Sequence, residues 1–180
     1  METPPFLPNY KQERNLMGIT MIKGLHHAAF RCQNSEQTRA FYEEFLGLTL
    51  AGALEIKETK TGRDASVLHS FYQLDDGSFI AFFEAPDQPF EFIKQHDYDL
   101  HLALEVTQAH LHEMFEKGKQ EGVPTRGISD HGFISSIYFR DPNGYVVELT
   151  AKNVGHDAHL QPNNQTARKL LSDWNARFHA

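Results

Sequence analysis

The chain has 180 residues and a net charge of -7, and these two quantities already exclude several classes of protein. The length allows one compact domain or two small modules packed together. With 23% charged and 40% hydrophobic residues, the composition is that of a globular protein and excludes a disordered or collagen-like chain. The acidic excess disfavours binding to nucleic acid or to an anionic membrane.

The cysteine content and the N-terminal segment bear on the cellular compartment of the protein. Cys32 is the single cysteine, so no intramolecular disulfide can form, which is typical of a reducing cytoplasm. The first twenty residues contain three prolines and no apolar run, unlike a signal peptide. No window reaches the roughly 18 apolar residues of a membrane-spanning helix. We expect a cytoplasmic protein with an N-terminal arm over residues 1–20.

A strand, a helix and three further strands are predicted in the first half of the chain. The first strand covers residues 23–32, and Ser35 is the predicted N-cap of a helix that ends at Gly47. Gly62 and a turn at residues 75–77 separate the strands that follow. Their predicted ranges are 48–58, 66–74 and 78–84.

The second half repeats this order of elements. A strand over residues 100–106 is followed by a helix over 108–121 and by strands over 124–128, 133–140 and 145–151. The turn sequence Asp76-Gly77 in the first half matches Asn143-Gly144 in the second. We therefore predict a duplicated domain at residues 21–151, with modules at 21–85 and 99–151. An extension over 152–180 contains an amphipathic helix at 167–178.

The alternation of side chains along the first strand of each module separates the histidines into two groups. Successive side chains of a strand point to opposite faces. In the second module the even positions 100–106 are all apolar, so they should pack under the helix and leave His101 on the other face. The same argument places His27 on that face and disfavours its neighbour His26. In the last strand, Glu148 is the carboxylate available beside them.

Two imidazoles and a carboxylate from separate strands are suitable ligands for a divalent metal ion. The imidazole nitrogens are borderline-soft ligands, and the carboxylate offsets the charge of the ion. The alternative is that His27 and His101 are hydrogen-bonded core histidines and that Glu148 ends a solvated strand. Histidines at the same place in both modules favour the metal site.

Several motifs resemble the vicinal oxygen chelate superfamily, which includes glyoxalase I, fosfomycin and bleomycin resistance proteins, methylmalonyl-CoA epimerase and extradiol dioxygenases. The resemblance covers about residues 21–151. It is carried by Gly24-Leu-His-His27, Phe41-Tyr42, Leu46-Gly47-Leu48, His101-Leu-Ala-Leu104, the segment Tyr138-Phe-Arg-Asp-Pro-Asn-Gly144 and Glu148-Leu149.

The resemblance implies an α+β fold in which two βαβββ modules form an open, curled mixed β-sheet barrel around a metal site. A C-terminal helix follows this barrel. The ligands of the family map onto His27, His101 and Glu148. A small-molecule substrate and a homodimer are also implied, with the metal site lying within one chain or shared between two.

The place of a fourth ligand bears on the reaction. Glyoxalase I and the epimerase resemble each other in having a fourth protein ligand on the last strand of the first module. Alignment of Gly77 with Gly144 puts Ala81 at that place, and alanine cannot bind a metal. Glu84 lies three residues further on, so we expect it on the opposite face. The remaining triad is typical of non-haem Fe(II) oxygenases, so we expect Fe(II), with Mn(II), Ni(II) or Zn(II) as alternatives.

Two further residues point towards dioxygenase chemistry. Tyr138 lies ten residues before Glu148. In this the chain resembles the extradiol dioxygenases, whose tyrosine at that distance hydrogen-bonds the catecholate. The alternative is that Tyr138 has a packing role. His131 precedes the same strand and is the candidate acid–base catalyst, with His69 as the alternative. We therefore predict an extradiol-type dioxygenase acting on a catecholic or related small oxygenated substrate. The alternatives are a glyoxalase I-like lyase or isomerase and a non-catalytic small-molecule (drug) binding resistance protein.

Overall fold

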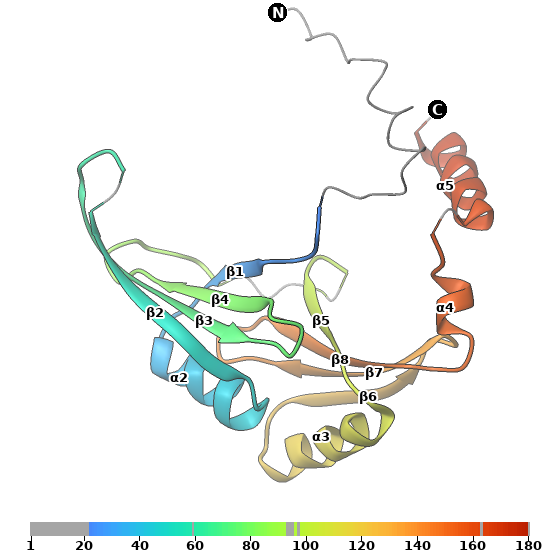
Figure 1. The fold of residues 1–180 in the computed structure, drawn as a ribbon, viewed down its shortest axis with the longest axis horizontal. Helices are drawn as coiled ribbons and strands as arrows, with labels where there is room; N and C mark the ends of the chain where they lie inside the picture. Colours follow the sequence, from blue (N-terminus) through green and yellow to red (C-terminus); the bar gives the residue numbers. More distant parts are fainter. Residues whose placement is uncertain (1–21, 59, 93–95, 97, 163, 180) are drawn as a thin grey trace, which may run out of the picture. The chain divides into compact units, whose positions relative to one another are not determined.

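The chain divides into two units, and the division lies between Pro89 and Phe90 in the sequence. The computed structural model describes residues 22–179 apart from 59, 93–95, 97 and 163. The predicted arm over residues 1–20 lies outside the described residues. Each unit is described separately below, and both are drawn in Figure 1.

The first unit is a four-stranded sheet with one helical segment. The strand order is β1-β4-β3-β2, with β1 parallel to β4 and the other neighbours antiparallel. The helical segment begins as an α-helix and continues as a π-helix. The elements are β1 (His27–Arg31), α2 (Ser35–Arg39), η1 (Ala40–Phe45), β2 (Thr49–Glu58), β3 (Asp64–Gln73) and β4 (Phe79–Glu84).

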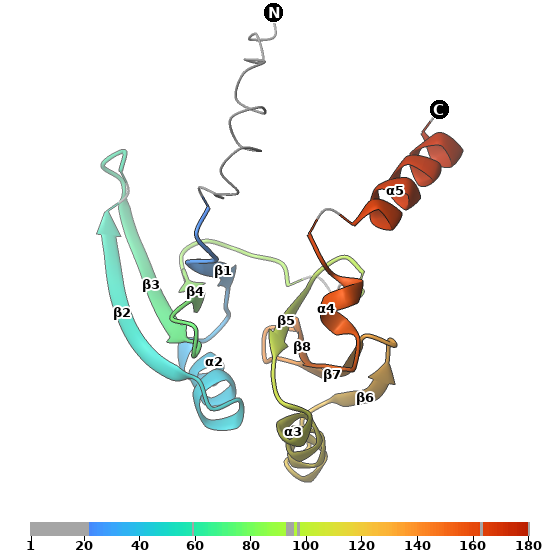
Figure 2. The same ribbon diagram turned by 45° about the vertical axis from the view of Figure 1, so that its right-hand side comes forward.

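The second unit repeats this topology with the order β5-β8-β7-β6. Its helix α3 packs against the sheet, as Figure 2 shows. The elements are β5 (His101–Glu105), α3 (Gln108–Gln120), β6 (Thr125–Asp130), β7 (Ile134–Arg140), β8 (Val146–Lys152), α4 (His156–His159) and α5 (Gln165–Phe178). The predicted α+β fold, with two four-stranded mixed sheets and a C-terminal helix, is confirmed. None of the helices in the described ranges has both the length and the apolar character to cross a membrane.

Two local predictions differ from the structure. The N-cap of α2 is Asn34 rather than Ser35, because the Asn34 side chain accepts a hydrogen bond from the Gln37 backbone at 2.9 Å. Both residues are favoured caps, so composition could not choose between them. Helix α4 was not predicted, because its four residues are too few to show a helical period.

The hydrophobic core of the first unit lies between its sheet and its helical segment. Tyr42, Tyr72 and Phe82 are each at most 1% exposed and pack ring against ring, with Tyr42 and Phe82 centroids 4.8 Å apart. Phe30 of β1 contacts Phe82 on the same side. The even positions of β1 therefore face the helix, as the alternation predicts, and His27 lies on the other face.

The pairing of strands supports the proposed duplication at the level of single residues. Ala29 of β1 pairs with Ala81 of β4, and Ala103 of β5 pairs with Glu148 of β8. Ala81 and Glu148 therefore occupy equivalent places in the two sheets, as the alignment of their turn glycines predicts.

Candidate functional site

The second sheet brings a histidine and a carboxylate together on the face opposite α3. His101 begins β5, and Glu148 lies near the middle of the neighbouring strand β8. The His101 Nε2 and Glu148 Oε2 atoms are 3.2 Å apart. The Glu148 side chain is only 6% exposed, whereas that of His101 is 41% exposed. A buried carboxylate requires a compensating partner, and the imidazole at its edge provides one.

A second polar pair adjoins Glu148 on the same face. Tyr138 of β7 is the direct cross-strand neighbour of Glu148, so both side chains project from the same side of the sheet. The Tyr138 hydroxyl lies 3.0 Å from His131 Nε2, a hydrogen bond in which either group can donate. The sequence indicated His131 and Tyr138 separately, and the structure brings them into contact.

The pKa of the Tyr138 hydroxyl is raised above its ordinary value. Burial is the main cause, and the negative charge of Glu148 acts in the same direction. A hydrogen bond with Ser136 and the positive charge of Arg126 partly oppose these effects. The Tyr138 phenol therefore keeps its proton to a higher pH than an ordinary tyrosine does.

Arg126 lies beside Tyr138 at the candidate site, and the sequence pattern did not indicate it. Its guanidinium lies 4.4 Å from the centroid of the Tyr138 ring, and the two residues are cross-strand neighbours on β6 and β7. A cation over an aromatic ring is a favourable contact. The sequence signal was the alternation on β6, but a register shift between Gly127 and Ser129 hides which positions face Tyr138.

The third predicted metal ligand, His27, belongs to the first unit. It lies on the face of β1 opposite the helical segment, and its Nδ1 atom is 2.8 Å from the Nδ1 atom of His26. His69 of β3 lies nearby on this face, with its ring centroid 6.4 Å from that of His27. His69 is buried, stacks on Phe83 and contacts the Phe82 carbonyl oxygen through Nδ1 at 3.0 Å.

Glu84 lies away from these histidines, in agreement with the alternation argument. Its Oε2 atom accepts a hydrogen bond of 2.6 Å from the Ser35 backbone, at the first turn of α2. The carboxylate therefore serves the start of the helix, where backbone N–H groups need acceptors. Ala81, which occupies the place equivalent to Glu148, is fully buried and offers no ligand atom.

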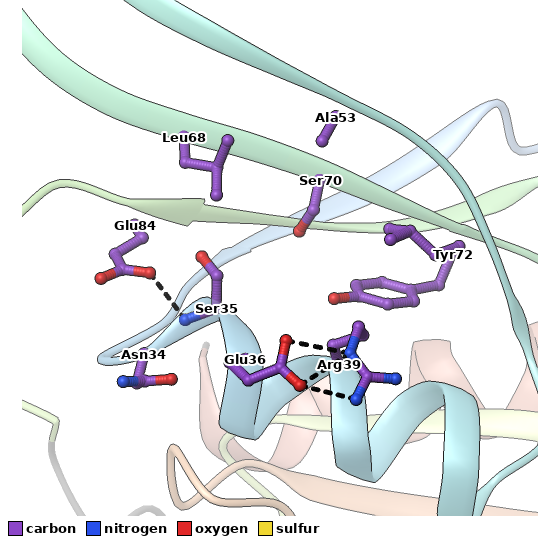
Figure 3. Close-up of a pocket in the computed structure, with 10 residues that line it drawn as sticks. Asn34, Ser35, Glu36, Arg39, Ala53, Leu68, Ser70, Tyr72 and Glu84 are labelled. Atoms are coloured by element: carbon purple, nitrogen blue, oxygen red, sulfur yellow. Dashed lines mark hydrogen bonds and ion pairs between the residues drawn. The ribbon is translucent and has the colours of Figure 1, made fainter.

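A cavity of about 380 Å³ also lies on the helix side of the first sheet. Figure 3 shows Glu84, Ser70 and Tyr72 projecting towards α2, with Glu84 near Ser35 and Tyr72 near Arg39. Because the cavity lies on the opposite face from His27, it does not contain the proposed metal ligand. Its lining residues are Asn34, Ser35, Glu36, Arg39, Leu50, Ala53, Leu68, Ser70, Tyr72 and Glu84.

The donor atoms of the second unit fit a divalent cation. An imidazole nitrogen and a carboxylate oxygen converge at 3.2 Å, and these are ligand types that Fe(II), Mn(II), Ni(II) and Zn(II) accept. Among the described residues of either unit taken by itself, no three His, Cys, Asp or Glu side chains gather as a metal-binding group. The pair of His101 and Glu148 is therefore the part of the predicted ligand set that one unit assembles.

Comparisons with known proteins agree with these motifs. A family model described as the Glyoxalase/Bleomycin resistance protein/Dioxygenase superfamily matches residues 24–149. A lactoylglutathione lyase from Neisseria meningitidis is 28% identical over 142 residues, which span 74% of this chain and 94% of the relative.

Several solved structures share the fold. The fosfomycin resistance protein FosX from Listeria monocytogenes, crystallised with Mn(II) and sulfate, has 22% identity and a TM-score of 0.57, covering 77% of this chain and 99% of that one. A glyoxalase/dioxygenase from Nostoc punctiforme has 18% identity and a TM-score of 0.57, covering 85% and 99%. At these identities the likeness establishes the fold.

Proposed function

Because the chain belongs to the Glyoxalase/Bleomycin resistance protein/Dioxygenase superfamily, we propose that it is a metal-dependent enzyme acting on a small substrate that binds through neighbouring oxygens. We further propose extradiol-type ring cleavage of a catecholic substrate as the reaction. Most members of this superfamily are metal-dependent enzymes, and they bind small molecules.

The contact between His131 and Tyr138, beside the pair of His101 and Glu148, is the observation that carries this proposal. An imidazole and a phenol in contact lie beside an imidazole nitrogen and a carboxylate oxygen on one face of the sheet, which supports the proposed roles of proton transfer, hydrogen bonding and metal binding. In the proposed reaction, the Tyr138 hydroxyl donates a hydrogen bond to a substrate oxygen. His131 takes a proton from the substrate and returns it to the product.

The proposed metal ligands are His101 and Glu148, with His27 as the third from the same chain or from a second copy. Since the Nδ1 atom of His27 contacts His26, binding through its Nε2 atom is expected. The bound ion would supply Lewis-acid and redox chemistry, with Fe(II) as the proposed metal. Glu148 is suited to this role because its buried charge needs a cationic partner.

A lyase resembling glyoxalase I is the second candidate, favoured by the lactoylglutathione lyase relatives at 28% identity. Ala81 opposes it, because that place would have to supply a fourth ligand. If the second candidate is correct, the protein loaded with Ni(II) or Zn(II) should catalyse the lactoylglutathione lyase reaction, assayed in the direction that forms lactoylglutathione.

Oxygen uptake tests the proposed reaction directly. The purified protein is loaded anaerobically with Fe(II) and then mixed in air with a panel of catechols. We expect oxygen consumption together with a coloured ring-cleaved product from at least one catechol. Glu148→Gln should abolish both, while His112→Gln, which changes an exposed histidine of α3, should leave them unchanged. Protein that binds Fe(II) but consumes no oxygen with any catechol would contradict the proposal.

A further inference from the structure

The loop between β6 and β7 carries His131 and is tied down on both sides of that residue. The His131 backbone donates a hydrogen bond to the Ile134 carbonyl at 2.9 Å, and the Gly132 backbone donates one to Asp130 Oδ1 at 2.7 Å. His131 itself is exposed, so packing around its ring restricts it little. The position of the imidazole therefore depends on how firmly the loop backbone is held.

Asn153, directly after β8, holds this loop through its side-chain amide. Its Nδ2 atom donates to Asp130 Oδ1 and to the Gly132 carbonyl, both at 3.2 Å. These acceptors belong to the residues immediately before and after His131. The Asn153 backbone adds a third tie by donating to the Phe133 carbonyl at 3.0 Å.

The other half of the same amide is anchored to the body of the unit. Asn153 Oδ1 accepts hydrogen bonds from Gln108 Nε2 of α3 at 2.8 Å and from Ser135 Oγ of β7 at 3.0 Å. An asparagine amide has two N–H donors and two acceptor lone pairs, and all four are used here. The side chain thus links the start of α3 to the loop that carries His131.

We propose that Asn153 is a positioning residue that fixes His131 against the Tyr138 hydroxyl. This inference rests on the proposed function, in which His131 moves a proton. The physical reason is that the two hydrogen bonds donated by Asn153 hold Asp130 and Gly132 on either side of His131. Loss of these hydrogen bonds therefore frees the backbone from which the imidazole projects. A displacement of about 1 Å at such a group can lower a rate about 100-fold.

The substitution Asn153→Asp tests the proposal, because it keeps the two acceptor positions and removes the two donors. It also places a negative charge beside Asp130 Oδ1, which should repel the loop. Gln108→Ala is the matched control, since it removes the bonds from Gln108 Nε2 to Asn153 Oδ1 and to the Lys152 carbonyl and leaves both bonds from Asn153 to the loop in place. Asn153→Ser serves as a second variant if Asn153→Asp fails to fold.

The decisive readout needs no substrate. Nuclear magnetic resonance of the His131 ring nitrogens reports its hydrogen bond to Tyr138, and amide hydrogen exchange reports the loop. In Asn153→Asp we expect the Nε2 signal to move towards that of a solvated imidazole and exchange at Gly132 to rise at least about 10-fold. Gln108→Ala should change neither. Unaltered His131 signals and unaltered Gly132 exchange in Asn153→Asp would overturn the proposal.

Activity separates this inference from the proposed function. If both hold, Asn153→Asp should lower kcat about 100-fold with little change in KM, and it should add almost nothing in a His131→Gln background. If the wild-type protein turns over no catechol, the proposed function fails, while the resonance experiment still decides the role of Asn153. Equal kcat losses from Asn153→Asp in both backgrounds would contradict positioning through His131.

Discussion

At the scale of single residues, one position distinguishes the two modules chemically. Ala81 and Glu148 have the same strand pairing, yet one is a methyl group and the other a buried carboxylate 3.2 Å from a histidine. Where the duplication would place a fourth ligand, this chain therefore has a side chain without a ligand atom. This difference favours a three-ligand centre over a four-ligand one.

His131→Gln tests the acid–base role proposed for the imidazole. Glutamine can still hydrogen-bond the Tyr138 hydroxyl but cannot exchange a proton near neutral pH. We expect kcat to fall on the order of 10²–10⁴-fold while metal content stays unchanged. Steady-state kinetics and metal analysis of the same preparation check this, and a variant with wild-type kcat would exclude His131 from the reaction.

The stability of the first unit should depend on pH at the alkaline end. Burial raises the pKa of the Cys32 thiol and of the Tyr72 phenol above their ordinary values of 9.0 and 10.0. Because the unfolded chain loses these protons first, it is favoured as the pH rises past the ordinary values. The contribution of these two protonated groups to the free energy of unfolding is fully present below about pH 8.5, and it is lost as the pH rises through their folded-state pKa values.

Urea unfolding at a series of alkaline pH values measures this effect. Tyr72→Phe and Cys32→Ala should each make the fall in unfolding free energy with pH shallower, since each removes one titrating group. Identical slopes in wild type and both variants would show that other groups cause the alkaline loss.

At the scale of elements, the sequence predicted strand and helix types well and boundaries within a few residues. Alternation identified the faces of β1 and β5, because their buried sides are continuously apolar. It could not reveal Arg126, since the register shift after Gly127 depends on how β6 pairs with β7. The contact of His131 with Tyr138 likewise depends on a loop whose course the sequence does not specify.

Close packing between α3 and its sheet gives a prediction at this scale. A Cβ atom added at Gly118 would clash with the Thr125 hydroxyl and lie 2.7 Å from the Phe139 ring. Gly118→Ala should therefore cost about 1–3 kcal/mol through overpacking, of which the helix preference of alanine recovers about 1 kcal/mol. Gly52→Ala is the control, because nothing lies within 4 Å of a Cβ there. Urea unfolding should show a clear loss for Gly118→Ala and a change below about 0.5 kcal/mol for Gly52→Ala.

At the scale of the whole molecule, internal duplication explains why so much could be predicted from the sequence. Two modules of the same topology place His27 and His101 at the starts of equivalent strands. This equivalence selected two candidate ligands from eleven histidines. The reaction is harder to predict from the sequence than the fold. The similar proteins include a lactoylglutathione lyase, matched by sequence, and a fosfomycin resistance protein, matched by structure.

The proposed homodimer belongs to the same scale. Light scattering coupled to size-exclusion chromatography should give twice the 20.6 kDa chain mass. If the metal site is shared between copies, mixing His27→Ala with Glu148→Gln protein should restore metal binding to part of the population. A measured particle mass equal to that of one chain would contradict the prediction.

Metal content tests the central claim most directly. The purified wild-type protein is loaded with Fe(II), Mn(II), Ni(II) or Zn(II) and then dialysed, and its metal content is measured by elemental mass spectrometry. The variants His27→Ala, His101→Ala and Glu148→Gln are treated in the same way. The account predicts about one equivalent per wild-type chain and loss of tight binding in all three variants, since each removes a proposed ligand. Wild-type protein that retains no metal, or variants that retain as much as the wild type, would contradict it.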